Sequence, residues 1–158
     1  MEVKPLFFDT YLGTIKNAVG SKMFQTVWAE VDGVRKDVIQ GGDLACATFV
    51  TGVLYLYDLI GDKHATVKST LEDLVKSGWY EIEKPKDGCV LVWEEEVFED
   101  GLHPHIGFYT GKETAVSNSK EMSSPQEHHW TYGVKNGAPV RKIVGMYWNN
   151  KLDNKYFG

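Results

Sequence analysis

A chain of 158 residues is long enough for one domain with a substantial buried core. The net charge of -5, with lysines scattered beside acids, excludes the basic stripe of a general nucleic-acid-binding protein. The hydrophobic fraction of 42% and the charged fraction of 25% are ordinary for a globular protein. We therefore expect a single domain over residues 1–158 and no nucleic-acid partner.

The beginning of the sequence lacks the basic start, continuous apolar segment and small-residue cleavage site of a secretory signal. The longest apolar-rich stretch, residues 49–60, is too short and too polar to cross a bilayer. These features predict no membrane insertion and a cytoplasmic location on synthesis, with export by a signal-independent route left open. Cys46 and Cys89 have different surroundings and no disulfide or zinc spacing, so we expect two free thiols.

The first half of the chain favours helices. Apolar residues at near-helical spacing predict a helix over residues 5–18, with Gly20 after its end. An Asp-Gly pair at 32–33, between β-prone runs, indicates a tight hairpin within residues 23–38. The sequence Gln-Gly-Gly-Asp at 40–43 breaks the chain and leads into a strong helix with an apolar face from Phe49 to Ile60. A further helix fits residues 66–76.

From Trp79 onward the pattern becomes strand-like. The candidate strands are residues 80–82, 89–93, 105–110, 114–117 and 140–147, with a hairpin turn at 111–113. The acidic run at 94–100 is interpreted as a solvated loop. Helices followed by an antiparallel sheet predict an α+β fold.

Cys46 stands where the Gly-Gly-Asp turn meets the first turn of the long helix. The partial positive charge at a helix N-terminus favours thiolate, the nucleophilic form of cysteine. The competing interpretation is a small apolar residue packed at a helix start, because free cysteines are commonly buried. A base brought close by the fold would favour the first interpretation.

His105 opens the segment His-Ile-Gly-Phe-Tyr. By strand alternation Ile106 and Phe108 share one face, which leaves His105 and Gly107 on the other. The glycine leaves room beside the histidine for a neighbouring chain or a substrate. His103 competes for the role, but the proline after it indicates a loop residue. A cysteine that opens a helix and a histidine that opens a central strand can meet at one cleft as nucleophile and base.

Four segments follow one another over about half of the chain, at residues 43–50 (Asp-Leu-Ala-Cys-Ala-Thr-Phe-Val), 87–93 (Asp-Gly-Cys-Val-Leu-Val-Trp), 105–111 (His-Ile-Gly-Phe-Tyr-Thr-Gly) and 115–119 (Ala-Val-Ser-Asn-Ser). Together they resemble the NlpC-type cell-wall cysteine peptidases and the related CHAP amidases. The resemblance implies a papain-like (NlpC-type) fold, with N-terminal helices packed on an antiparallel sheet. It also implies a peptide or peptidoglycan substrate, cleaved at an amide bond.

The chain departs from that family around the nucleophile and at the third catalytic position. An aspartate usually precedes the cysteine and a serine follows it, whereas both neighbours here are alanine. The third position is often a histidine on the strand after the base, and counting through the hairpin places Ser117 there, beside Asn118. Asn118 has the better chemistry, because its amide oxygen can accept from imidazole, and Ser117 has the better register. His129 is a further candidate for orienting His105.

Gln40 lies six positions before Cys46, the spacing at which papain-like peptidases place an oxyanion-hole glutamine. A plain loop glutamine is the alternative, and the backbone N–H of Cys46 would supply the second donor. In the mechanism that follows, His105 takes the thiol proton, the thiolate attacks the amide carbonyl, and water hydrolyses the thioester. This chemistry requires no metal or organic cofactor.

Two other functions fit the same residues. The missing family residues would suit an inactive module that binds peptide or glycan, and an amine or lipid acceptor that captured the thioester would make the protein an acyltransferase. The pKa of the Cys46 thiol separates enzyme from binding module, because a depressed value favours the enzyme.

Overall fold

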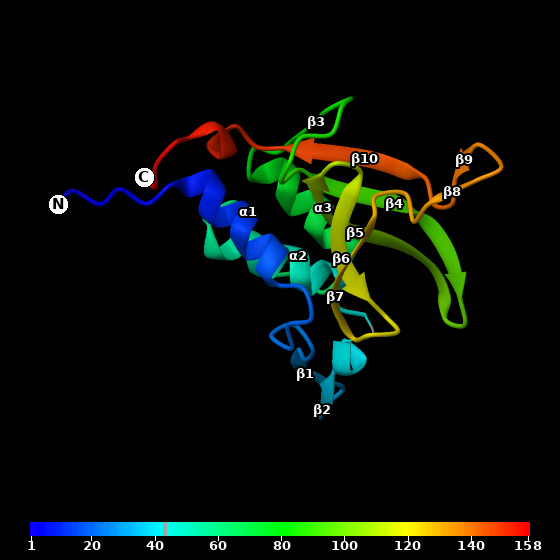
Figure 1. The fold of residues 1–158 in the computed structure, drawn as a ribbon. Helices are drawn as coiled ribbons and strands as arrows, with labels where there is room; N and C mark the ends of the chain where they lie inside the picture. The colour runs from blue at the N-terminus through cyan, green and yellow to red at the C-terminus, as the bar shows by residue number, and fades with distance from the viewer. Residues whose placement is uncertain (43) are drawn as a thin grey trace.

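The computed structural model describes residues 1–42 and 44–158, so that Asp43, which belongs to the first motif, lies outside the described residues. Within these ranges the chain forms three α-helices and a six-stranded antiparallel sheet, with two small hairpins. Figure 1 shows the helices on one side of the molecule and the curved sheet on the other. The predicted α+β class is confirmed at this level.

The three helices lie close to their predicted positions. Helix α1 (Phe7–Asn17) buries one stripe, and the hydroxyl of Tyr11 donates to the carbonyl of Gly88 at 2.7 Å. Helix α2 (Cys46–Leu56) is the most apolar of the three and ends before Ile60, so it is shorter than predicted. Helix α3 (Val67–Lys76) is capped by Thr66, whose hydroxyl accepts from the backbone N–H of Ser69 at 3.2 Å.

The main sheet has the strand order β3-β10-β4-β5-β6-β7, and every neighbouring pair is antiparallel. Its strands are β3 (Tyr80–Glu81), β10 (Ile143–Trp148), β4 (Val90–Phe98), β5 (Gly101–Gly111), β6 (Thr114–Ser119) and β7 (Ser124–His129). The hairpins pair β1 (Trp28–Val31) with β2 (Val34–Asp37), and β8 (Val134–Lys135) with β9 (Ala138–Pro139). Asp32 (φ 52°) and Gly33 (φ 75°) both take the left-handed conformation that the predicted tight turn requires.

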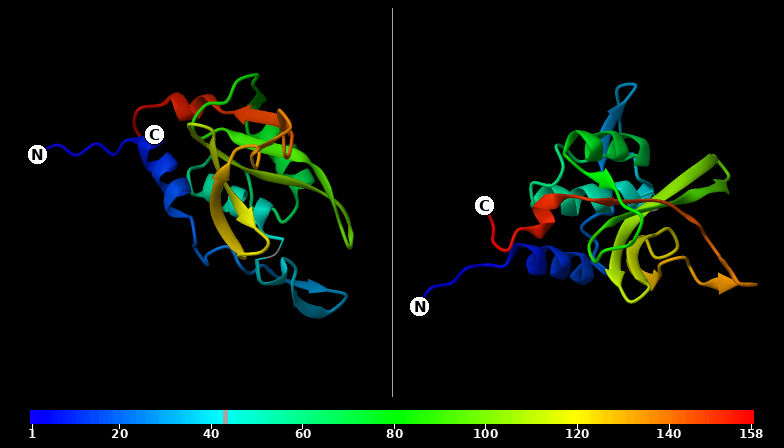
Figure 2. Two further views of the ribbon diagram at one scale, coloured as in Figure 1. Left: turned by 45° about the vertical axis from the view of Figure 1, so that its right-hand side comes forward. Right: turned by 90° about the horizontal axis from the view of Figure 1, so that it is seen from above.

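The acidic segment at 94–100 differs from its prediction as a loop. Strand β4 continues through it to Phe98, and β5 already begins at Gly101. The two strands form a long hairpin that projects beyond the rest of the sheet (Figure 2). His103 therefore lies in a strand, because Pro104 falls where the register shifts between the pairs Trp93↔His105 and Glu96↔His103, a place that tolerates proline. Charged side chains on an exposed hairpin produce the same sequence pattern as a solvated loop.

The core fixes β5 against the helices. The Phe108 ring packs edge-on against Tyr11 and Phe49, at centroid distances of 6.1 and 5.5 Å. On the other face of β5, a Cβ atom on Gly107 would lie 2.7 Å from the Cβ of Ser117, so the predicted glycine gap is filled by the neighbouring strand β6. No helix within the described ranges is long and apolar enough to cross a membrane.

Candidate functional site

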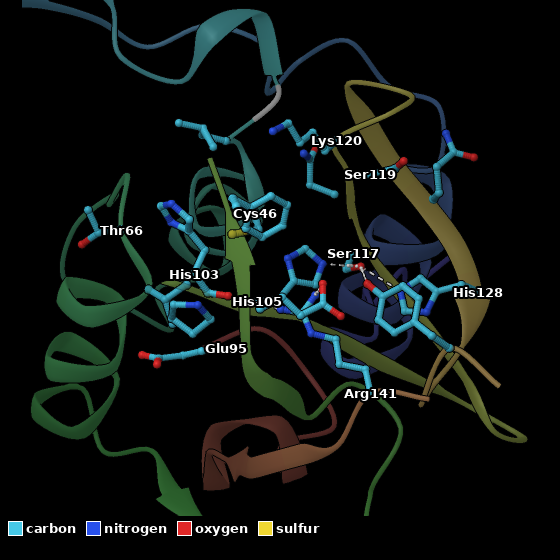
Figure 3. Close-up of a pocket in the computed structure, with 18 of the residues that line it drawn as sticks. Cys46, Thr66, Glu95, His103, His105, Ser117, Ser119, Lys120, His128 and Arg141 are labelled. Atoms are coloured by element: carbon cyan, nitrogen blue, oxygen red, sulfur yellow. Dashed lines mark hydrogen bonds and ion pairs between the residues drawn. The ribbon is translucent and has the colours of Figure 1, made fainter. Parts of the chain in front are cut away.

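A pocket of about 830 Å³ opens where the beginning of α2 meets β5 and β6. Cys46, His105 and Ser117 all line it, and Figure 3 shows them around the same space. Further walls come from the β4–β5 hairpin and α3, which contribute Phe98 and Lys68 among others, and from β7 and the segment before β10, which contribute His128 and Arg141. The structure thus brings the predicted nucleophile and base to one cleft, although they belong to different layers of the fold.

Cys46 is the first residue of α2 and is partly buried. Burial raises the pKa of its thiol, and the backbone N–H groups of Ala47 and Ile106 lower it by a smaller amount. Ile106 follows His105 in β5, and Cys46 and His105 line the same pocket. The expectation that the helix N-terminus would depress this pKa is therefore wrong, because loss of hydration outweighs the nearby N–H dipoles. The thiol of Cys46 is therefore neutral at rest.

His105 is neutral as well. Burial lowers the pKa of its imidazole to about 3, and electrostatic interactions with Arg141 and His128 act in the same direction. The ring lies against the indole of Trp93, its partner in the β4–β5 ladder, at a centroid distance of 5.3 Å. A neutral imidazole keeps one unprotonated nitrogen, which is the requirement for a base.

Ser117 links His105 to a second histidine. The Ser117 hydroxyl lies 2.9 Å from Nε2 of His105, 2.7 Å from Nε2 of His128 and 3.1 Å from the hydroxyl of Tyr132. Strand pairing explains this cluster, because Gly107 pairs with Ser117, and Ala115 pairs with His128. Alternation then places all three polar side chains on one face of the sheet.

The network also assigns the direction of each hydrogen bond. Nδ1 of His128 lies 2.7 Å from the carbonyl oxygen of His129, which can only accept, so Nδ1 carries the proton and Nε2 is an acceptor. Ser117 must therefore donate its hydroxyl proton to His128. Its two remaining lone pairs accept from Nε2–H of His105 and from the hydroxyl of Tyr132, whose pKa is raised by burial. The proton of His105 thus sits on Nε2, and Nδ1 is left unprotonated.

Three other predicted site residues do not take their predicted roles in the described part of the chain, although Asn118 also lines the pocket. Asn118 is buried with 4% of its surface exposed, and its amide nitrogen donates to the carbonyl of Gly42 at 2.8 Å, so it anchors the 3-10 turn η1 (Gln40–Gly42) instead of orienting His105. Its position one residue after Ser117 turns it to the opposite face. Gln40 is exposed, has φ 54° and does not line the pocket, which contradicts its oxyanion role. Its place before two glycines fits the alternative of a loop residue.

His129 does not orient His105 either. Its Nδ1 accepts from the N–H groups of Thr131 and Gly133, at 3.2 and 3.0 Å, and so holds the turn after β7. Ser117 makes the hydrogen bond to His105, and His128 contacts that serine where His129 does not, because adjacent residues of a strand face opposite sides. If β7 had been recognised as a strand paired with β6, strand alternation would have favoured His128 over His129.

Sequence reasoning missed two more pocket residues. Tyr132 stacks on His128 with a centroid distance of 4.1 Å and an interplanar angle of 14°. Arg141 reaches the pocket from the segment before β10 with 7% of its surface exposed. Neither residue belongs to a sequence motif. Arg141 reaches the site only through long-range pairing of the sheet, so no local pattern could have indicated it.

The arrangement combines a thiol, an imidazole of fixed tautomer and a pocket that both residues line, which are parts that acyl transfer needs. Within the described part of the chain, no three His, Cys, Asp or Glu side chains are grouped so that they could hold a metal ion. The NlpC-type resemblance is carried by the motifs alone. Comparisons with protein-family models, with curated proteins and with solved structures gave no match.

Proposed function

We propose that this protein is a cysteine peptidase or amidase that cleaves amide bonds through a thioester on Cys46, with His105 as the base. The observation that carries the proposal is the hydrogen-bond chain from His105 through Ser117 to His128, which fixes the protonated nitrogen as Nε2. A base held in one tautomer beside a thiol in a shared pocket is the central arrangement of cysteine hydrolases.

The reaction begins from a neutral pair. Nδ1 of His105 takes the thiol proton as the sulfur of Cys46 attacks the amide carbonyl, which forms the S–C bond and an oxyanion. The first-turn N–H groups of α2 have no intrahelical acceptor and can stabilise this charge. The C–N bond then breaks, and the amine leaves with the proton from Nδ1.

Water completes the cycle. With His105 again as the base, a water molecule attacks the thioester, the carboxylic acid leaves, and the proton returns to the sulfur. Ser117 and His128 hold the imidazole in place through both steps, and the imidazolium that forms transiently can share its Nε2 proton with Ser117. No carboxylate takes part in this chain of contacts, so the imidazolium is stabilised by neutral dipoles.

The substrate class follows from the motif resemblance, which implies peptide bonds of peptidoglycan. The pocket can hold a peptide segment, since a volume of about 830 Å³ lies within the range of small-molecule sites. Its walls combine apolar contacts, such as Phe98 and Val140, with charged groups, such as Lys120 and Arg141.

The experiment that tests the proposal is digestion of purified peptidoglycan, with mass analysis of the released fragments. Cys46→Ala should abolish release, whereas Cys89→Ala is a matched control, because Cys89 is buried outside the pocket and burial raises its thiol pKa to about 11. Both variants should keep the unfolding temperature within a few degrees of the parent. Fragment release that persists in Cys46→Ala would end the proposal.

A second candidate function is favoured by the electrostatics of the pair. A thiol with a raised pKa next to an imidazole with a lowered pKa also suits a module that binds peptide or glycan without cleaving it. Such a module would bind muropeptides with equal affinity before and after Cys46→Ala and would release no fragments. The digestion experiment separates the two functions.

A further inference from the structure

Arg141 is a nearly buried cation in the wall of the pocket. Only 8% of its side-chain surface is exposed. Figure 3 shows it reaching into the space from the side opposite Cys46. A buried guanidinium is costly unless its donors are satisfied and an anion lies nearby. The partners of this side chain therefore show how much of its binding capacity remains for a ligand.

Most of its five N–H donors are used to hold the β4–β5 hairpin. Nε and Nη2 donate to the carbonyl of Glu94 at 3.1 and 2.9 Å, and Nη2 also donates to the carbonyl of His103 at 3.3 Å. Nη1 contacts a carboxylate oxygen of Glu96 at 3.3 Å. A guanidinium carries two N–H bonds on Nη1, so one of them has no partner in these contacts.

Glu96 is a weak partner for so buried a charge. Half of its side-chain surface is exposed (50%), and the contact of 3.3 Å is longer than a strong charge-assisted hydrogen bond. It is also the sole carboxylate among the contacts made by Arg141 in the described part of the chain. A solvated carboxylate on a projecting hairpin can swing away and leave the guanidinium open on the side of Nη1.

The same guanidinium lies close to the reacting groups. It lines the same pocket as Cys46 and His105, and its charge lowers the pKa of both. Lys68 and Lys120 also line the pocket, together with the carboxylates of Glu95 and Glu96, so that the cations outnumber the acids by one.

From these contacts we infer that Arg141 binds a carboxylate of the substrate, and that Glu96 occupies this position when the pocket is empty. This inference rests on the proposed function, and it narrows the substrate to amides that carry a free carboxylate within a few atoms of the scissile carbonyl. Two kinds of peptide have such a carboxylate. In one, the residue next to the cleaved bond is C-terminal; in the other, that residue is linked through its side chain and keeps its main-chain carboxylate free. A bidentate carboxylate would use the fork geometry that Glu96 uses only in part.

The test does not require the natural substrate. Iodoacetate and iodoacetamide alkylate a thiol by the same reaction, in which the S–C bond forms, iodide leaves and the thiol proton is released. They differ in one group, since the first carries a carboxylate and the second a neutral amide. The ratio of their second-order rate constants at Cys46, divided by the same ratio for the small neutral thiol N-acetylcysteine amide, reports anion recognition in the pocket. Mass analysis after digestion identifies the alkylated residue.

We call the quotient of these two ratios the normalised ratio. In the parent protein we expect it to be about ten, which is the effect of one charge-assisted contact. Glu96→Gln removes the competing carboxylate and keeps the side-chain shape, so it should raise the ratio further. Arg141→Met should bring the ratio to about one. Arg141→Lys keeps the charge without the fork and should fall between them. Circular dichroism checks that the Arg141 variants retain the fold, and the Glu96 variant tests the inference without disturbing the hairpin contacts.

A normalised ratio of one in the parent, or a ratio that Glu96→Gln leaves unchanged or lowers, would overturn the carboxylate site and leave the hydrolase proposal standing. A Cys46 that reacts with neither reagent up to pH 9 would contradict the hydrolase proposal, and the carboxylate site with it.

Discussion

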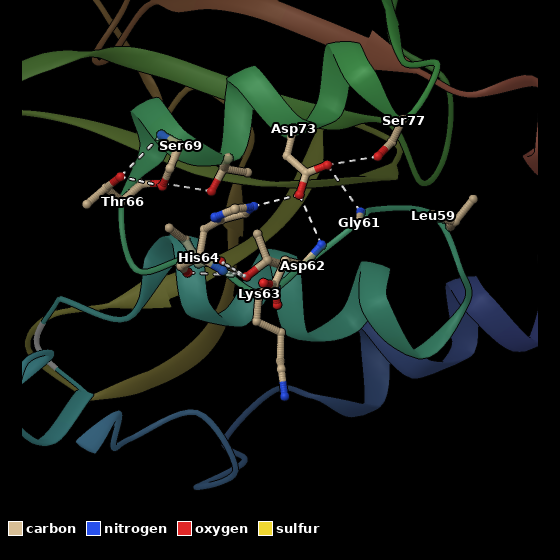
Figure 4. Close-up of polar contacts among 12 residues, drawn as sticks. Leu59, Gly61, Asp62, Lys63, His64, Thr66, Ser69, Asp73 and Ser77 are labelled. Carbon is tan, nitrogen blue, oxygen red and sulfur yellow. Dashed lines mark hydrogen bonds and ion pairs between the residues drawn. The ribbon is translucent and has the colours of Figure 1, made fainter. Parts of the chain in front are cut away.

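Two histidines of this chain sit in polar networks that look alike and differ in chemistry. Nε2 of His105 lies 2.9 Å from a serine hydroxyl, in a chain that ends on a backbone carbonyl. Nε2 of His64 lies 2.6 Å from the carboxylate of Asp73, in a network that ties the loop before α3 to the helix (Figure 4). The first network faces the pocket, and the second lies outside it.

The carboxylate in the second network is fixed in its charged state. Burial alone would raise the pKa of Asp73, but hydrogen bonds from His64 and Ser77 and from the N–H groups of Gly61 and Asp62 lower it to about 2. Every partner stabilises the charge, so the network has one stable arrangement. In the first network every group is neutral, and each hydrogen bond has one direction, which leaves Nδ1 of His105 unprotonated. The comparison teaches that a histidine paired with a partly buried, hydrogen-bonded carboxylate holds structure, whereas one linked through a hydroxyl keeps a ring nitrogen that can accept a proton.

The largest effect should come from removing the link between the two pocket histidines. Ser117→Ala deletes the acceptor of Nε2–H and allows the proton of His105 to move to Nδ1, the nitrogen that must act as base. We expect kcat on peptidoglycan fragments to fall about a hundredfold, within the range for general-base catalysis. Steady-state kinetics measure the loss, and KM should change little, because Ser117 has 1% of its surface exposed. Full activity in this variant would show that the tautomer is set by other groups.

A smaller loss should follow from replacing the end of the chain. His128→Phe keeps a ring that can stack on Tyr132 but removes the nitrogen that accepts from Ser117. The serine hydroxyl can then rotate, so we expect kcat to fall about tenfold. His129→Phe is the matched control, because it removes the turn contacts of the adjacent residue and should lower the unfolding temperature with kcat preserved. Equal losses of kcat in both variants would indicate that each substitution damages the end of β7, and not that His128 acts through Ser117.

The sequence predicted the helices, the first hairpin and the pairing of β5 with β6 because each depends on local patterns of apolar residues and turns. It did not predict β7, since Ser-Pro-Gln-Glu-His-His has no alternation of apolar and polar residues. A strand at the end of a sheet is specified by the ladder with its neighbour, here from Thr114↔His129 to Ser119↔Ser124, and not by its own composition.

The site residues also divide into those marked by local patterns and those that depend on long-range pairing. Cys46 and His105 were found because a helix start and a strand motif mark them in the sequence. The choice of Ser117 over Asn118 depended on the register between β5 and β6, and the choice of His128 over His129 depended on a strand that local patterns did not reveal. The pKa of Cys46 could not be predicted, since hydration is lost through contacts with residues that are distant in the chain. Arg141 joins the pocket only once the hairpin has formed.

The neutral state of His105 predicts a stability change with pH. The unfolded chain binds a proton at this imidazole below about pH 6.5, and the folded protein does so only near pH 3, so folding loses stability as pH falls between these values. One such proton contributes at most about 1.4 kcal/mol per pH unit. Urea unfolding at pH 7, 6, 5 and 4 should show a flatter decline for His105→Asn than for the parent. Parallel curves would mean that His105 carries its proton in the folded state too.

The smallest effect should come from the His64–Asp73 network, and it should leave catalysis intact. Asp73→Asn replaces the charged acceptor of four hydrogen bonds, and we expect a loss of about 1 kcal/mol, or about 3 °C in the unfolding temperature. Because the folded pKa lies below the unfolded one, this stabilisation is complete above about pH 4 and is lost as pH falls towards 2. The difference between parent and variant should therefore be constant from pH 7 to 5 and disappear near pH 2, in contrast to the His105 effect, which begins near pH 6.5. A kcat that falls tenfold in Asp73→Asn would contradict the separation of the two networks, because it would mean that the loop before α3 shapes the pocket through Thr66 and Lys68.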